Sequence, residues 1–352
     1  MRNFESDNTS GASPEVLDAL IRANQGSAAS YGADTITAGL TTRFSELFER
    51  QVAVFPVATG TAANALALTS LCPPFGLIYC HRDAHVSVHE CGAPEFYTGG
   101  AKLGLLDGPA GKISPDAVAE ALASVWRGSE HMVQPAAISL TQATEFGAVY
   151  TMDEIAALCD LAHGEGLRVH MDGARFANAL VHLDCAPADI TWRAGIDVLS
   201  FGATKNGAMA AEAVVFFDPE LANDFLYRRK RGGHLISKMR FLSVQLQAYL
   251  DDGLWLRNAA HANACAARMA AGLAATPGVE LDAPVEANMI FAWLPAALVE
   301  TLLADGFRFH VMGEDGPRRR ARLVVSFNTG DDVVAAFLDS LGRYAGATRA
   351  TG

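Results

Sequence analysis

Short apolar segments recur along the first two thirds of this chain, and stretches with a helical pattern lie between them. The apolar segments have the length of strands and cover Val52–Val57, Leu77–Cys80, Ala136–Leu140, Leu167–Met171, Ile196–Phe201 and Ala213–Phe217. The helical patterns cover Ala62–Leu71, Pro115–Val125, Met152–Glu165 and Pro187–Ala194. Because these strands are apolar on both faces, they need helices on both sides. The alternation predicts a three-layer α/β fold built on a mostly parallel sheet.

The pattern changes after Phe217, and the last third predicts a smaller α+β domain. The expected elements there are two helices, two strands and a final helix, over Met239–Leu254, Ala259–Ala275, Met289–Leu294, Leu323–Phe327 and Asp331–Tyr344. We therefore expect an N-terminal segment and large domain over residues 1–245, and a small C-terminal domain over residues 246–352.

Composition excludes several classes of protein. The 352 residues are 50% hydrophobic and 19% charged, which is typical of a packed globular chain. The formal net charge of −12 argues against a nucleic-acid partner, because such partners need a basic surface. No apolar run is long enough to span a membrane, and no signal peptide is apparent, so we expect a soluble cytoplasmic protein. The six cysteines form no CxxC pair, which favours buried small side chains over a metal site.

Two short motifs, 33 residues apart, carry the chemistry. Asp172 closes an apolar run in His170–Arg175, where an unpaired buried carboxylate would be costly without a function. Lys205 lies among small residues in Ser200–Gly207, and partial desolvation near other cations would lower its pKa and yield a usable amine. A Schiff-base lysine and a carboxylate for the pyridinium nitrogen are what a protein supplies to pyridoxal phosphate. The sequence therefore predicts a pyridoxal-phosphate enzyme, and the same residues also allow a helix cap at Asp172 and a surface lysine.

Two further motifs follow predicted strands. Thr59-Gly60-Thr61 opens a helix, where backbone N–H groups can bind a phosphate, although a plain helix cap is as common. His85 follows the second strand and could stack on a planar cofactor and move protons near neutral pH. The alternative for His85 is an ordinary loop histidine.

Three basic segments are less specific. Arg228–Arg231 reads as a solvated face that could meet an anion, together with Lys238 after a flexible glycine turn. Arg318–Arg320 reads as a solvated loop. Arg322 directly precedes a strand, and its planar guanidinium could bind a substrate carboxylate through two hydrogen bonds.

These motifs together resemble the low-specificity L-threonine aldolases, which are pyridoxal-phosphate enzymes with an aspartate-aminotransferase-like fold. The resemblance covers nearly the whole chain and rests on motifs in the family's order, at Ser6-Asp7, Tyr31-Gly32, Thr59-Gly60-Thr61, Ala84-His85, Asp172–Arg175, Thr204-Lys205, Gly232-Gly233 and Arg322. It implies cleavage of L-threonine, L-allo-threonine and related β-hydroxy-α-amino acids to glycine and an aldehyde.

The resemblance also implies the roles of single residues. Lys205 would bind the cofactor covalently, Asp172 would pair with its ring nitrogen, and His85 would stack on its ring. The residues implied around the cofactor phosphate and the substrate are Gly60, Thr61, Ser6, Tyr31, Arg175 and Arg322. Arg231 and Lys238 would reach the phosphate of a neighbouring subunit, which implies sites at a dimer interface and dimers that pair into tetramers.

One stretch departs from the family pattern. Many members carry a second active-site histidine before a glycine, and here Glu145 holds that place in Ala143–Gly147. Either His85 acts with water, or Glu145 shares the role of base, or neither is essential.

Several alternatives stay open. Another enzyme of this fold, namely an aminotransferase, a racemase or a β-eliminating lyase, would use the same residues. An aldolase that prefers phenylserine, or a non-catalytic binding protein, is also compatible with them. A nucleotide-dependent dehydrogenase is disfavoured because no GxGxxG follows the first strand.

Overall fold

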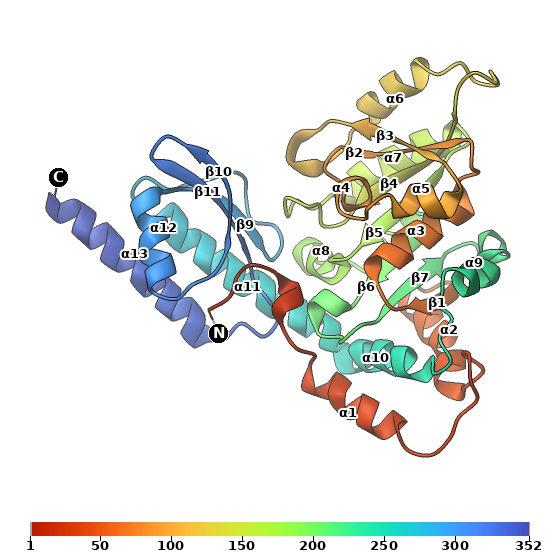
Figure 1. The fold of residues 1–352 in the computed structure, drawn as a ribbon, viewed down its shortest axis with the longest axis horizontal. Coiled ribbons are helices and arrows are strands. Elements are labelled where there is room, and N and C mark those ends of the chain that lie inside the picture. The colour runs from red at the N-terminus through yellow and green to blue at the C-terminus, as the bar shows by residue number, and fades with distance from the viewer. Residues whose placement is uncertain (1, 352) are drawn as a thin grey trace.

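The computed structural model describes residues 2–351 and contains two sheets of different size. Figure 1 shows the large unit on one side and the small unit on the other, with the long helix α11 (Leu254–Ala274) reaching from one to the other. The predicted α/β fold with a large, mostly parallel sheet and a smaller α+β part is confirmed. Among the described helices, none combines the length and the apolar character that crossing a membrane requires.

The large sheet has seven strands in the order β1-β7-β6-β5-β4-β2-β3. Their bounds are β1 (Ala53–Val57), β2 (Gly76–His81), β3 (Lys102–Leu106), β4 (Gln134–Thr141), β5 (Arg168–Gly173), β6 (Val198–Gly202) and β7 (Glu212–Phe216). Strand β7 is antiparallel to both β1 and β6, and the other pairs are parallel. Six strands, β1, β2, β3, β4, β5 and β6, therefore end at the same edge of the sheet.

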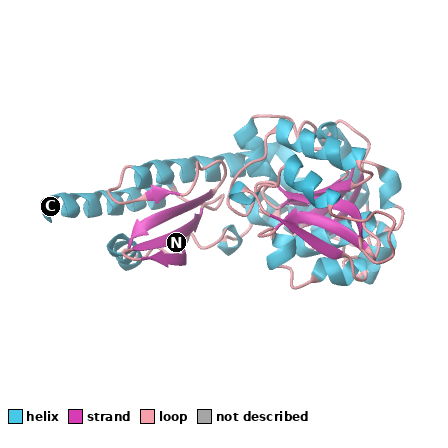
Figure 2. Ribbon diagram, turned by 90° about the horizontal axis from the view of Figure 1, so that it is seen from above, coloured by secondary structure: helices cyan, strands magenta, loops and turns pink. Residues whose placement is uncertain are grey.

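Helices cover both faces of this sheet, as the two-sided apolar strands require (Figure 2). One face packs against α2 (Thr35–Leu47), α6 (Pro115–Ala123), α7 (Met152–Gly164), α8 (Phe176–Leu183) and α10 (Arg240–Leu250). The other face packs mainly against α3 (Gly60–Leu71) and α9 (Phe225–Arg231). Shorter or peripheral helices are α1 (Pro14–Ala23), α4 (His85–Val88) and α5 (Ala93–Thr98).

The small unit packs helices on one antiparallel sheet in the order β10-β11-β9-β8. Its strands are β8 (Glu280–Leu281), β9 (Met289–Pro295), β10 (His310–Asp315) and β11 (Arg318–Val324), and its helices are α12 (Ala296–Ala304) and α13 (Asp331–Thr351). The second half of α11 joins this core through residues such as Met269. The first half, including Trp255 and Ala259, packs in the core of the large unit. The division of the chain at residue 245 stays a prediction, because the core changes gradually along α11.

The N-terminal segment connects the two units. Phe4 is fully buried in the small core, and its backbone N–H and C=O bond Arg308 and Val324 at 2.7 and 2.8 Å. A few residues later, the Ser13 N–H bonds the Gly207 carbonyl at 2.8 Å, next to the turn that carries Lys205. Ser6 and Asp7 are thereby held between the two units.

Two sequence predictions of secondary structure are wrong. Residues 187–194 form turns and the short 3-10 helix Trp192–Ala194, because Thr191 has a non-helical backbone and Asp189 accepts the N–H of Ala186. The segment Arg318–Arg320 lies in β11 and pairs with both β9 and β10, so it is not a solvated loop. Its side chains form ion pairs with carboxylates such as Asp282, which lets a charged run serve as a strand.

Candidate active site

The predicted motifs meet at the shared edge of the large sheet. Asp172 lies at the end of β5, Lys205 follows β6, and Gly60 opens α3 directly after β1. This edge, where parallel strands end, is the usual ligand site of open α/β sheets. A cavity of about 390 Å³ is lined by these three residues together with His85, Thr61, Glu212 and other neighbours.

The close approach of β5 and β6 brings Asp172 and Lys205 together. A Cβ atom on Gly202 would lie 2.7 Å from both the Cα atom of Ala174 and the carbonyl oxygen of Gly173. Only glycine fits there without moving one of the two backbones. Gly202 therefore allows β5 and β6 to approach closely, and this approach brings the two motifs together in space.

Asp172 is 3% exposed, and both of its carboxylate oxygens have partners. Oδ2 accepts a 2.8 Å hydrogen bond from Asn64 Nδ2, and Oδ1 accepts one of 3.0 Å from the Ala174 N–H. These donors hold the carboxylate in one orientation at the wall of the cavity. Asp172 is more than a helix cap. One of its oxygens accepts a backbone N–H two residues later, as a cap would, but the other accepts from a side-chain amide on α3.

Lys205 lies in the 3-10 turn Thr204–Asn206 and reaches into the cavity. Burial lowers the pKa of its amine, and the Arg175 guanidinium lowers it further, against the opposing charges of Asp7, Asp172 and Glu212. Among residues 2–351, no acceptor or anion lies within bonding distance of Nζ. A desolvated amine without a partner is the form that adds to a carbonyl carbon.

The first turn of α3 faces the same cavity. Thr59 caps the helix, and its hydroxyl accepts the Ala62 N–H at 3.2 Å. Gly60 has open space where a side chain would be, and Thr61 and Thr204 line the wall nearby. A helix N-terminus with adjacent hydroxyls has the donors and the dipole direction that bind a phosphate.

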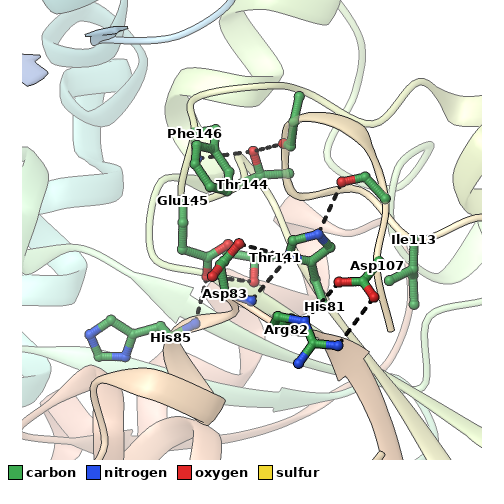
Figure 3. Close-up of polar contacts among 12 residues, drawn as sticks. His81, Arg82, Asp83, His85, Asp107, Ile113, Thr141, Thr144, Glu145 and Phe146 are labelled. Atoms are coloured by element: carbon green, nitrogen blue, oxygen red, sulfur yellow. Dashed lines mark hydrogen bonds and ion pairs between the residues drawn. The ribbon is translucent and has the colours of Figure 1, made fainter. Parts of the chain in front are cut away.

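His85 and Glu145 meet at the ends of β2 and β4 (Figure 3). The His85 backbone N–H donates to Glu145 Oε1 at 2.7 Å, and the Thr141 hydroxyl donates to the same oxygen at 3.0 Å. Glu145 Oε2 is buried and has no partner within the described chain. Burial raises the pKa of Glu145, and these hydrogen bonds oppose the rise only in part.

The arginines predicted near the substrate differ in their surroundings. Arg175 already forms a two-bond ion pair with Asp7, at 2.8 and 3.0 Å, and both side chains are buried. Arg322 makes one long contact of 3.4 Å to the Glu5 carbonyl, and burial lowers its pKa. Its guanidinium therefore keeps most of its donors for a ligand. Ser6 lies beside them, and its hydroxyl accepts the Asn8 N–H.

Three predicted residues lie elsewhere on the surface of this chain. Tyr31 is 51% exposed and stacks against the Lys230 amine, 4.6 Å from its ring centroid. Arg231 and Lys238 are exposed and do not line the cavity of their own chain. Their role at the phosphate of a neighbouring subunit stays a prediction.

Sequence reasoning assigned no role to four buried polar residues of the site, namely Asp7, Asn64, Glu90 and Glu212. Asn64 interrupts the apolar run 62–68, and Glu212 precedes the apolar residues of β7, so each was a usable signal. Asp7 and Glu90 lie in irregular segments, where a carboxylate is usually exposed and therefore gives no sign of a buried functional role.

Glu212 faces Lys205 from the antiparallel strand β7. Its Oε2 accepts the Ala203 N–H at 2.7 Å and so holds the start of the lysine turn. Burial raises the pKa of its carboxyl from 4.5 to about 7. The folded state therefore binds this proton more tightly than the unfolded state does.

We expect this carboxyl to make stability depend on pH. As the pH rises from 4.5 to about 7, the unfolded chain loses the proton first, and the folded state loses about 3 kcal/mol of stability. In Glu212→Gln this loss should be absent. Denaturant unfolding of both cofactor-free proteins at about pH 5 and pH 8 measures it, and parallel pH dependences in the two proteins would contradict it.

The residues of this cavity fit pyridoxal phosphate. An amine without a partner, a buried carboxylate and an open helix N-terminus surround one space, and these are the three groups that the cofactor's aldehyde, ring nitrogen and phosphate require. Lys205, Asp172 and the Gly60–Thr61 turn would hold it.

Comparisons with known proteins agree with this arrangement. Residues 3–296 match the family model of beta-eliminating lyases. The chain is 46% identical to a low specificity L-threonine aldolase from Pseudomonas sp. (strain NCIMB 10558), over 93% of each chain. The structure of a Leishmania major threonine aldolase superposes with a TM-score of 0.92 at 30% identity, covering 98% of this chain and 100% of that one. A serine palmitoyltransferase from Sphingomonas wittichii, at 15% identity and a TM-score of 0.72 over 99% and 88% of the two chains, shares the fold alone. The resemblance predicted from the motifs is confirmed.

Proposed function

Because the chain belongs to the beta-eliminating lyase family, as one of its low specificity L-threonine aldolases, we propose that it cleaves L-threonine and L-allo-threonine to glycine and acetaldehyde. Related β-hydroxy-α-amino acids would give glycine and the corresponding aldehyde. The observation that carries the proposal is the partnerless Lys205 amine beside the buried Asp172 carboxylate in one cavity. When bound, pyridoxal phosphate supplies the electron sink for breaking the bond between the α and β carbons.

The residues of the chain perform the other tasks. Asp172 keeps a proton on the cofactor's ring nitrogen, because an anion at that position stabilises the positive ring. Arg322 binds the substrate carboxylate with the donors that its single contact to Glu5 leaves available. Arg175 lies close to both Arg322 and Lys205, and its ion pair with Asp7 balances the added positive charge.

The substrate hydroxyl needs a base at its oxygen, and we assign the acceptor to the pair His85 and Glu145. Both lie at the same edge of the sheet, and the His85 backbone N–H donates a 2.7 Å hydrogen bond to Glu145 Oε1. Glu145 does not itself line the cavity, so the substrate proton would reach its unpartnered Oε2 through His85 or a water molecule. The raised pKa of Glu145 makes it a stronger base than an exposed glutamate.

Glu145→Gln tests this assignment. The amide keeps an oxygen for the His85 N–H and the Thr141 hydroxyl but cannot accept a proton at neutral pH. We expect kcat for L-threonine to fall by about 10²-fold or more, with cofactor binding unchanged. Steady-state kinetics and cofactor absorbance measure the two effects. A variant with the wild-type kcat would remove Glu145 from the reaction and leave His85 with water.

One activity panel tests the function as a whole. Purified holoenzyme is incubated with L-threonine, L-allo-threonine and phenylserine, and the aldehydes and glycine are measured. The same protein is incubated with an amino acid and a keto acid, which would reveal amino transfer. Aldehyde and glycine in equal amounts support the proposal, whereas amino transfer without aldehyde would favour an aminotransferase.

We also propose that two chains form a dimer and that dimers pair into tetramers, with Arg231 and Lys238 reaching the partner's cofactor phosphate. Phe96 and Tyr227 are 78% and 75% exposed, and both line a groove that includes Arg231. Large exposed aromatic side chains of this kind mark contact surfaces. Light scattering measures the number of chains in the assembly. An active enzyme that is monomeric would contradict the proposed dimer. A cytoplasmic location remains a further prediction.

A further inference from the structure

We propose that Glu90 is a positioning residue that holds the His85 ring with its proton on Nδ1 and leaves Nε2 to accept a proton in the cavity. This inference rests on the proposed function and deepens it, because it explains how His85 becomes a base of defined orientation. Glu90 does not line the cavity, so it acts through the two side chains that it bonds, His85 and Asn64.

The contact between the two side chains is short and shielded from water. Glu90 Oε1 lies 2.8 Å from His85 Nδ1, and the Glu90 side chain is 0% exposed. The His85 side chain is 37% exposed, so its other edge stays accessible. Within the described chain, Nε2 of His85 has no hydrogen-bond partner.

The donor in this contact follows from the neighbouring amide. Asn64 Nδ2 lies 2.8 Å from Glu90 Oε1 and 2.8 Å from Asp172 Oδ2. An amide nitrogen with two hydrogens suits two carboxylate oxygens, whereas an amide oxygen there would face two acceptors. Oε1 of Glu90 therefore already accepts one hydrogen bond. Any proton on Glu90 would be carried by Oε2, which has no partner, so Oε1 also accepts from His85 and the proton lies on Nδ1.

The network also connects His85 to the carboxylate of the cofactor's ring nitrogen. The series His85–Glu90–Asn64–Asp172 is continuous through three contacts of 2.8 Å. The hydrogen bond to Glu90 raises the pKa of His85, with the charge of Asp172 in the same direction, and burial and Lys205 oppose it. Glu145, which bonds the His85 N–H, and His89, whose ring lies 5.6 Å away, also face this group.

Two variants separate charge from position. In Glu90→Gln, the amide oxygen can accept from both Asn64 and His85, so the ring keeps its orientation and only the charge is lost. In Glu90→Leu, both the acceptor and the charge are lost. Glu95→Gln, a half-buried carboxyl five residues away, is the matched control.

The direct measurement is modification of His85 by diethyl pyrocarbonate, which attacks an unprotonated imidazole nitrogen. Peptide mass spectrometry follows His85 in the holoenzyme from about pH 5 to pH 8, with exposed His131 as internal reference. We expect Glu90→Gln to raise the His85 rate several-fold at about pH 6 and to move the acid limb of kcat/KM to lower pH. Glu95→Gln and His131 should show no change.

Glu90→Leu should lower kcat by at least tenfold with little change in KM, because a ring free to rotate loses its orientation. A folded Glu90→Leu with the wild-type kcat would overturn the inference. If that variant fails to fold, a wild-type modification profile for His85 in Glu90→Gln would overturn it, because a bonded carboxylate must change the affinity of His85 for its proton. If no aldehyde forms in any protein but the His85 profile still shifts, the proposed function fails and the role of Glu90 stands.

Discussion

Lys205→Ala is expected to abolish cleavage of L-threonine and to leave no cofactor covalently bound. No other amine among the residues that line the cavity could replace it. The loss should reach the detection limit, because removing the nucleophile of a covalent mechanism costs many orders of magnitude in rate. Aldehyde release measures the activity. Reduction with borohydride followed by peptide mass spectrometry identifies the modified lysine in the wild type.

Lys102→Ala provides the matched control, since Lys102 is an exposed lysine on the edge strand β3. It should keep full activity and the same reduced adduct at Lys205. A Lys205→Ala protein that cleaves threonine at the wild-type rate would remove the basis of the assignment. An adduct at any other lysine in the wild type would have the same consequence.

Asp172→Ala should give the second largest effect. Without the carboxylate, nothing keeps the ring nitrogen protonated, and the Asn64 amide and the Ala174 N–H lose their shared acceptor. We expect kcat to fall by about 10³-fold and the cofactor to dissociate more readily, since electrostatic stabilisation of this kind is often the largest single effect. Kinetics at saturating cofactor separate slow chemistry from cofactor loss.

Asp116→Asn, a change at an exposed carboxylate in the first turn of α6, is a control for general effects on the chain. It should leave kcat and cofactor affinity unchanged. Normal cleavage by Asp172→Ala at saturating cofactor would count against the ring-nitrogen role. In that case the buried Asp172 would be a helix cap, as its alternative reading predicts.

The sequence predicted the large unit well for a physical reason. Strands buried on both faces must be apolar throughout, so β4, β5 and β6 stand out from their surroundings without any knowledge of their neighbours. Residues 187–194 failed because a helical pattern there competes with the Asp189 and Thr191 side chains, which bond the local backbone. Strand β3 was missed because it is a short edge strand with mixed exposure.

The candidate site divides in a similar way. Asp172 lies at the end of a strand in a mostly parallel sheet, and Lys205 and Gly60 each follow one, so their meeting was predictable from order alone. The polar residues around them were not predictable in this way. Asn64, which bonds Asp172, comes from α3, Asp7, which pairs with Arg175, comes from the N-terminal segment, and Glu212, which accepts the Ala203 N–H, comes from the antiparallel strand β7. The contacts of Asn64 and Asp7 span 108 and 168 residues along the chain, and the contact of Glu212 spans only nine but needs the pairing of β6 with the antiparallel β7.

By itself, the sequence determined which elements form and which residues carry the reactive groups, because apolar periodicity and residue type are local properties. Only the tertiary structure decided which reactive side chains are already paired and which stay available to a ligand. Arg175 is bound by Asp7 while Arg322 stays available, and His85 is held by Glu90 rather than left as a loop side chain. Burial, charge and hydrogen bonding act through space, and no pattern along one strand or helix records them.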